Sequence, residues 1–240
     1  MIGSLLGDAL SFIGRNGQIP GQSGFPTLVY LTLNTLKIAA IGIGISLVLA
    51  IPLGVWLGHI HRGSFIAINL GNIWRSLPSL AVLAIGVAFL GIGLDNVELA
   101  LIVLAVPPMI TNSYVGIDGV DRDVVDAARG MGMTEGEIVA RVELPLAIPL
   151  IFAGIRTSSL FVISTTTIAA LTGYSGSLGD IINNETSYHL YGVLGAAICI
   201  AALALVVDFA LAAIQRLITP KGLIVAADVA PTLELAPAVG

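Results

Sequence analysis

Charged residues are scarce in this sequence. Asp, Glu, Lys and Arg together account for 10% of its 240 residues, whereas soluble domains usually contain about 25%. Hydrophobic residues account for 56%, and the mean hydropathy is +0.99. A soluble globular domain is therefore excluded, and the sequence predicts an all-α polytopic membrane protein.

Several features that would define other classes of protein are also missing. The single cysteine, Cys199, excludes a disulfide within the chain, and the net charge of −5 argues against a nucleic-acid partner. His59, His61 and His189 lack the spacing to cysteines or carboxylates that a metal site needs. No GxxxxGK sequence followed by Ser or Thr is present, so work driven by ATP would need a separate ATPase. We expect no catalytic residues, metal or cofactor on this chain.

What the sequence does contain is a series of long apolar runs. At 1.5 Å per residue, the charge-free run 38–58 is long enough to cross a hydrocarbon core about 30 Å thick. Similar runs predict about five transmembrane helices, at residues 28–58, 76–94, 99–117, 146–171 and 190–217. Residues 64–74 fit either a separate interfacial helix or the beginning of the second span.

Basic residues fall in alternate loops between these spans. One set of loops contains Arg62, the arginines of residues 118–149, and then Arg216 and Lys221, whereas the short loops between them contain no Lys or Arg. Because basic residues favour the cytoplasmic side, residues 118–149 and the C-terminus are predicted to be cytoplasmic. With five spans, the N-terminus is then outside.

The two ends of the chain differ from the apolar middle. Residues 1–27 are glycine-rich and only weakly apolar, and they read as an extracytoplasmic or interfacial lead-in, although Arg15 opposes an outside location. Residues 218–240 are rich in alanine and proline, which predicts a disordered cytoplasmic tail. The domain between them, residues 28–217, contains all the predicted spans.

Residues 121–149 form a polar segment between strongly apolar ones. Asp121 is placed to cap a first short helix, and Asp123 lies in its first turn, where backbone N–H groups favour negative charge. Glycines at 130 and 132 predict the end of that helix, because glycine tolerates the left-handed cap conformation.

A second short helix is predicted immediately afterwards. Thr134 and Glu137 have the spacing of a capping box, and Glu137 and Arg141 have the i, i+4 spacing of an ion pair. Pro145 should end this helix, because the residue before a proline disfavours helical geometry. The polar segment is therefore predicted to be a compact helix-turn-helix unit with one apolar side.

The same segment resembles a known signature. The run 126–149, DAARGMGMTEGEIVARVELPLAIP, is similar to the EAA signature of binding-protein-dependent ABC importer permeases. The matching positions are Asp126, Ala127, Ala128, Gly132, Leu144 and Pro145. Asp126 stands where the family more often has glutamate. The resemblance extends over about residues 33–217, and its details look most like the permeases of osmoprotectant importers.

This resemblance implies a fold and a coupling site. The fold would be that of type I ABC importer permeases, in which a cytoplasmic loop, here about residues 118–149, docks into a groove on the ATPase. The coupling residues would be Asp126, Ala127, Ala128, Gly130, Gly132, Leu144 and Pro145. A plain alternative for Asp126 is that it only occupies a solvated helix face.

The resemblance also implies partners, a substrate class and a location. The partners would be two cytoplasmic ATPase subunits that carry ATP and Mg, a second copy or paralogue of the permease, and an extracytoplasmic solute-binding protein. The solute would be glycine betaine, choline or carnitine, with a methionine-, taurine- or phosphonate-type solute as the alternative. The location would be a bacterial or archaeal cytoplasmic membrane.

Two charged residues lie within predicted spans. A charge in lipid costs about 2.5–3.5 kcal/mol on insertion scales, so Arg156 in the fourth span and Asp208 in the fifth need an explanation. They lie at matching depths, which predicts that they pair or face a common cavity. Both a structural ion pair and a gate remain open.

Aromatic residues offer a further possibility. Quaternary ammonium groups are recognised by aromatic faces, and the chain has two tryptophans and five tyrosines. Most lie near predicted membrane interfaces, where an aromatic belt is the ordinary explanation. Their spacing does not assemble a cage.

Parts of the sequence also fit two functions of other classes. The sequence Gly173-Tyr174-Ser175-Gly176, with His189 downstream, matches a short pattern of intramembrane serine proteases, which need nucleophile and base within hydrogen-bond reach. Glycine and serine are also ordinary turn residues. A secondary carrier or channel would need no motor, but it would have little use for a capped helix pair outside the membrane.

Overall fold

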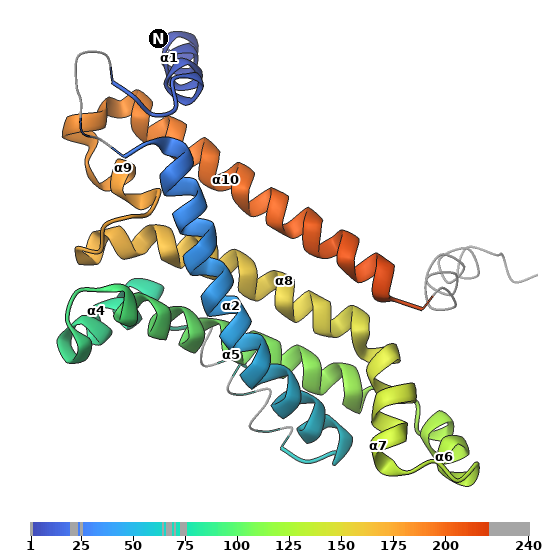
Figure 1. Cartoon of the computed structure of the whole chain (residues 1–240). Coiled ribbons are helices and arrows are strands. Elements are labelled where there is room, and N and C mark those ends of the chain that lie inside the picture. The colour runs from blue at the N-terminus through green and yellow to red at the C-terminus, as the bar shows by residue number, and fades with distance from the viewer. Residues whose placement is uncertain are drawn as a thin grey trace, which may run out of the picture.

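The computed structural model describes residues 2–19, 24, 26–63, 65, 69, 71–72 and 76–220, and every regular element among them is helical (Figure 1). The helices are α1 (Ile2–Gly14), α2 (Leu28–His59), α4 (Ser79–Leu90), α5 (Leu94–Asp118), α6 (Arg122–Gly130), α7 (Glu135–Ile138), α8 (Leu144–Ile168), α9 (Gly179–Asn183) and α10 (Glu185–Ile218). A π-helical turn (Val139–Glu143) joins α7 to α8, and a 3₁₀ turn (Ala169–Thr172) follows α8. The predicted tail falls almost wholly at 221–240, outside the described residues.

Four of the described helices are long and apolar enough to cross a membrane, namely α2, α5, the run from Glu135 to Thr172 that contains α8, and α10. The second predicted span is shorter than expected. Its helix α4 has 12 residues and a length of about 18 Å, against about 30 Å of hydrocarbon. Pro78 precedes α4 and Gly91 ends it at φ +77°, so the apolar run is helical over only part of its length. The choice between a separate helix at 64–74 and an early part of this span falls largely outside the described residues.

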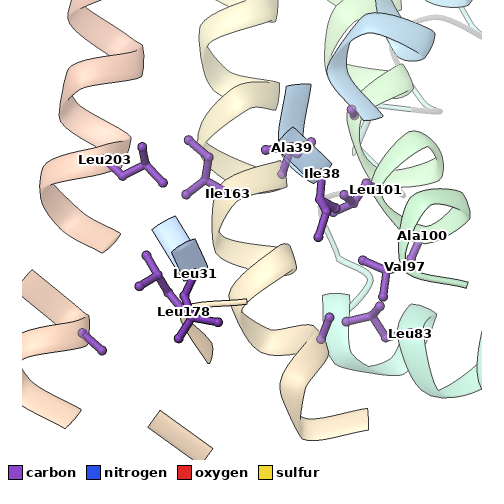
Figure 2. Close-up of a cluster of buried hydrophobic side chains, with 14 of the residues drawn as sticks. Leu31, Ile38, Ala39, Leu83, Val97, Ala100, Leu101, Ile163, Leu178 and Leu203 are labelled. Atoms are coloured by element: carbon purple, nitrogen blue, oxygen red, sulfur yellow. The ribbon is translucent and has the colours of Figure 1, made fainter. Parts of the chain in front are cut away.

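The long helices pack around one apolar core. The most extensive contacts join α2 to α5 and α5 to α8. Figure 2 shows Leu31 and Ile38 from α2, Leu101 from α5 and Ile163 from α8 in this core, together with Leu178, which precedes α9. All five side chains are at most 2% exposed. The core therefore ties the first half of the chain to the second.

Glycines on α2 allow its close approach to α5. A methyl group added at Gly54 would lie 2.7 Å from the Cβ of Ser113, and one added at Gly58 would lie 2.7 Å from the Cβ of Ile117 and 2.9 Å from the carbonyl oxygen of Tyr114. Two glycines four residues apart are a common means of bringing membrane helices together. The α2–α5 contact therefore depends on the absence of side chains at these positions.

Gly58→Ala is expected to destabilise the protein by about 1–3 kcal/mol, because the added methyl group overpacks the contact. Thermal unfolding of the purified protein in detergent measures the effect. Gly44→Ala is the matched control, since no atom lies within 4 Å of the added methyl group. Alanine favours helix over glycine by about 1 kcal/mol, so the control should be neutral or stabilised. A stabilised Gly58→Ala protein would contradict the close packing.

Different helices form the two ends of the bundle. Helices α6 and α7 project beyond α5 and α8 at one end, whereas α1, α9 and the beginning of α10 lie at the other (Figure 1). Helix α1 packs against α10, with Phe12 edge-on to Tyr188 at a centroid distance of 6.3 Å. The predicted lead-in thus contains a helix that covers the end of the bundle opposite the polar segment.

Candidate functional site

The polar segment contains the caps that its sequence predicts. Asp121 caps α6 and accepts a hydrogen bond from the N–H of Asp123 at 2.9 Å. Thr134 and Glu137 form the reciprocal capping box that starts α7. Between the two helices, Gly132 has a φ of +85°, the left-handed conformation that only glycine adopts without strain. The prediction of two capped helices joined by a glycine turn is confirmed.

The prediction that Pro145 ends the second helix is wrong. Helix α7 continues through the π-helical turn into α8, and Pro145 lies in the first turn of α8. In the π turn the N–H of Leu144 reaches the carbonyl of Val139, five residues earlier, and such a local π adjustment is one way for a continuous helix to accept a proline, which has no N–H to donate. The polar segment is therefore continuous with a membrane-length helix (Figure 1).

A small apolar core holds α6 against α7. Val120, Val125, Ala128 and Ile138 are buried together, and Ile138 is fully inaccessible. Ala128 is thus a packing residue rather than a surface one. Leu144 packs in a neighbouring cluster between α5 and α8. The two short helices are fixed relative to each other and to the bundle.

A neighbouring side of α6 is exposed and partly apolar. Val124 is 45% exposed and Met131 is 74% exposed, and Ala127 is exposed between them. Their spacing of three and four residues places them on one side of the helix. Gly130 and Gly132 are also exposed at the end of this strip. Of the expected coupling residues, Asp126, Ala127, Gly130 and Gly132 are therefore available to a partner.

Arg129 connects the two short helices by ion pairs. Its guanidinium donates to Asp126 at 3.0 Å and to both carboxylate oxygens of Glu135 at 3.0 and 3.1 Å. The hydrogen bond and charge of Glu135 raise the pKa of Arg129 above its ordinary value, so the group stays charged. Asp126 thus has a partner within its own helix, and one of its roles is to hold Arg129 over the glycine turn.

A second network joins the polar segment to the end of α2. His59 Nδ1 lies 2.8 Å from Oε2 of Glu143, and His59 Nε2 lies 3.4 Å from Oε2 of Glu135. His61 Nδ1 lies 2.7 Å from Oδ1 of Asp118. Glu143 is only 1% exposed, so His59 is the group that satisfies a buried carboxylate. These residues were missed in the sequence, where the only signal was a histidine pair in the first basic loop.

These charged groups surround a pocket of about 230 Å³. It is lined by His59, His61, Arg122, Val125, Asp126, Arg129, Glu135 and Glu143. Its wall comes from α2, α6 and α7, so any movement of the short helices relative to α2 changes it.

His59→Ala is expected to lower the stability of the protein by about 1–3 kcal/mol, the usual cost of leaving a buried acceptor unsatisfied. The loss should appear as a lower unfolding temperature in detergent. The control is Arg141→Ala, because Arg141 is 69% exposed and its ion pair with Glu137 spans 3.7 Å, an arrangement worth about 0.5 kcal/mol or less. Equal losses in the two variants would contradict a structural role for the His59–Glu143 contact.

The two charged residues of the predicted spans meet in the structure. Arg156 of α8 donates from Nε and Nη2 to the two oxygens of Asp208 of α10, each at 2.7 Å. This two-pronged geometry is the strong form of an arginine–carboxylate pair. A pocket of about 290 Å³ adjoins it, lined by Ala153, Thr157 and Leu160 in addition to the pair. The pair therefore joins α8 to α10 at the edge of a hollow.

The protease pattern does not assemble a catalytic site. Ser175 is exposed in the loop after α8, and no hydrogen bond joins it to His189 within the part of the chain that the structure describes. The ring of His189 lies instead against Tyr191, with a centroid distance of 5.4 Å. The short pattern is explained by turn residues, including Gly173 and Gly176, both with positive φ.

The chain is similar to known proteins over most of its length. Residues 24–221 match the family described as binding-protein-dependent transport system inner membrane component. The glycine betaine/carnitine/choline transport system permease protein OpuCB of Bacillus subtilis strain 168 is 40% identical over 203 residues, which cover 84% of this chain and 93% of that protein. The choline transport system permease protein OpuBB of the same organism is 39% identical, with the same coverage.

The fold is also similar to that of a solved transporter. An inward facing conformation of the MetNI methionine ABC transporter matches with a TM-score of 0.69 at 23% identity, covering 80% of this chain and 96% of that one. At that identity the likeness concerns the fold.

Proposed function

This chain belongs to the family of binding-protein-dependent transport system inner membrane components, and we propose from that premise that it forms the translocation pathway of an ATP-driven importer for quaternary ammonium solutes such as glycine betaine, choline or carnitine. The solute class rests on the names of relatives that are about 40% identical over 84% of the chain. ATP hydrolysis then takes place on a separate subunit, and this chain has no enzymatic activity of its own.

The observation that carries the proposal is the exposed strip on α6. Val124, Ala127 and Met131 form an apolar surface at the tip of a charged, projecting unit, and such surfaces usually mark a protein partner. The strip ends at Gly130 and Gly132, where a partner can approach the backbone closely. We assign this surface to the ATPase, with the polar segment on the cytoplasmic side, as its arginines favour.

The construction of the polar segment suits the transmission of force. Its α7 end continues into α8 through the π-helical turn, and its buried Glu143 contacts His59 at the end of α2. A displacement of α6 by a closing ATPase dimer would therefore reach two long helices as a rigid-body movement rather than being absorbed in a flexible loop. Asp126, through Arg129, stiffens the same unit.

The full importer would contain other chains. A single bundle of this size is small for an alternating-access pathway, so a second permease copy or paralogue would complete it, with two ATPase subunits on the cytoplasmic side. An extracytoplasmic binding protein would deliver the solute to the opposite end. With the polar segment inside, the end that carries α1 and α9 faces outside (Figure 1).

The proposal is tested by uptake in a strain that lacks this chain. Labelled glycine betaine, choline and carnitine are supplied at raised osmolarity, with and without the chain restored. Uptake of at least one of them should require both this chain and its ATPase. Restored uptake of methionine, taurine or a phosphonate alone would overturn the solute class but keep the importer. Uptake without any ATPase would overturn the importer and indicate a carrier or channel.

A further inference from the structure

We infer that the end of this chain opposite the polar segment holds its own binding site for a quaternary ammonium headgroup, formed by Tyr30, Tyr174, Tyr188 and Asp180. The inference rests on the proposed function and extends it, since it places a solute-recognition site on the permease itself. The supporting observation is a pocket of about 590 Å³ lined by all four residues.

The aromatic residues come from three separate parts of the chain. Tyr30 lies in the first turn of α2, Tyr174 in the loop after α8, and Tyr188 in the first turns of α10. The sequence spacing could not bring them together, but the fold places the beginnings of α2 and α10 and the loop before α9 at one end (Figure 1). All three tyrosines then line one pocket.

The chemistry of the pocket suits a cation that cannot donate hydrogen bonds. A trimethylammonium group has no N–H, so it is recognised by aromatic faces and by a nearby negative charge. Asp180 supplies the charge, and no basic residue is among those that line the pocket. Burial raises the pKa of Asp180 above its ordinary value, although hydrogen bonds from the backbone N–H groups of Gly176 and Ser177 oppose the shift, and a bound cation would favour the charged carboxylate.

The walls of the pocket are held in place before any ligand binds. Asn34 of α2 donates to the carbonyl of Gly176 at 2.6 Å and hydrogen-bonds Tyr174. Asp180 accepts from the N–H of Gly176, and Thr35 accepts from the N–H of Leu178 at 3.0 Å. These bonds fix the loop after α8 against α2. A site that is already ordered loses less entropy on binding.

Tyr188 and Tyr30 differ in how much of each side chain is exposed. Tyr188 is 3% exposed and packs against Phe12, so it forms a fixed floor. Tyr30 is 58% exposed and forms an outer wall. The pocket is therefore bounded by one buried and one exposed tyrosine, at the end of the bundle that faces outside in the proposed orientation. Such a site would receive the headgroup before it passes between the long helices.

Direct binding of labelled choline to the purified permease–ATPase complex in nanodiscs, without a binding protein, tests the inference. Tyr174→Leu and Tyr30→Leu should each weaken binding about three- to tenfold, as expected for loss of one cation–π contact. Tyr174→Phe keeps the ring and should bind nearly as wild type. Trp56→Leu is the matched control, because Trp56 is an exposed aromatic of α2 outside this pocket.

A neutral analogue separates charge recognition from mere apolar contact. The compound 3,3-dimethylbutan-1-ol has the shape of choline without its charge, so it should fail to compete, and Asp180→Asn should weaken choline binding while Trp56→Leu does not. Equal competition by the neutral analogue, or choline binding unchanged by the Tyr174→Leu and Asp180→Asn variants, would overturn the inference. Solute uptake by wild-type cells is measured separately. If the cells take up the solute but the purified complex does not bind choline, the proposed site is overturned and the proposed function stands.

Discussion

Met131→Glu is expected to detach the ATPase from this chain and to abolish solute uptake. Met131 is 74% exposed, so the substitution should leave the chain folded, yet it would place an unpaired charge within the proposed docking surface. Burying such a charge at an interface costs about 2–5 kcal/mol, and about 2.8 kcal/mol is already a hundredfold loss of affinity. Co-purification of the ATPase with the permease measures the loss.

Two further variants make this result interpretable. Met131→Leu keeps an apolar side chain at the same place and should retain the ATPase. Gly132→Arg should also lose it, but Gly132 has a φ of +85°, so any side chain there adds backbone strain of about 1–2 kcal/mol. Full ATPase retention by Met131→Glu would contradict docking on the exposed face of α6.

The polar segment shows which features a sequence predicts well. The caps at Asp121 and Thr134 and the turn at Gly132 depend on residues no more than three positions apart, and all are present in the structure. The predicted helix end at Pro145 also depends on neighbouring residues, but this prediction was wrong. A proline usually ends a helix, and nothing in the local pattern showed that a π-helical turn would absorb it.

Features that depend on tertiary contacts were visible only in part. The pairing of Arg156 with Asp208 could be anticipated, because two charges in apolar runs at matching depths need each other. The contact between His59 and Glu143 could not, since both residues occupy polar stretches where charges are ordinary. The length of α4 was also missed, because hydropathy alone does not show that Gly91 ends the helix inside an apolar run.

Arg156→Met is expected to destabilise the protein strongly, because it leaves Asp208 without a partner in a membrane-length helix. An unpaired aspartate costs about 2.5–3.5 kcal/mol at the centre of a membrane helix, and somewhat less nearer its end. The arginine side chain is 36% exposed and the aspartate 21%, so about 1–3 kcal/mol is the expected loss. Unfolding temperature in detergent or nanodiscs measures it.

The double variant Arg156→Met/Asp208→Leu distinguishes the two roles that the sequence left open. Replacing both partners of a buried ion pair by apolar residues is often neutral or stabilising, so stability should return in either case. If the pair only joins α8 to α10, uptake should return with it. If the pair is a gate beside the hollow lined by Ala153 and Leu160, the stable double variant should still fail to couple uptake to ATP hydrolysis. A double variant that remains as unstable as Arg156→Met would contradict both, since the lost stability would not come from the unpaired charge.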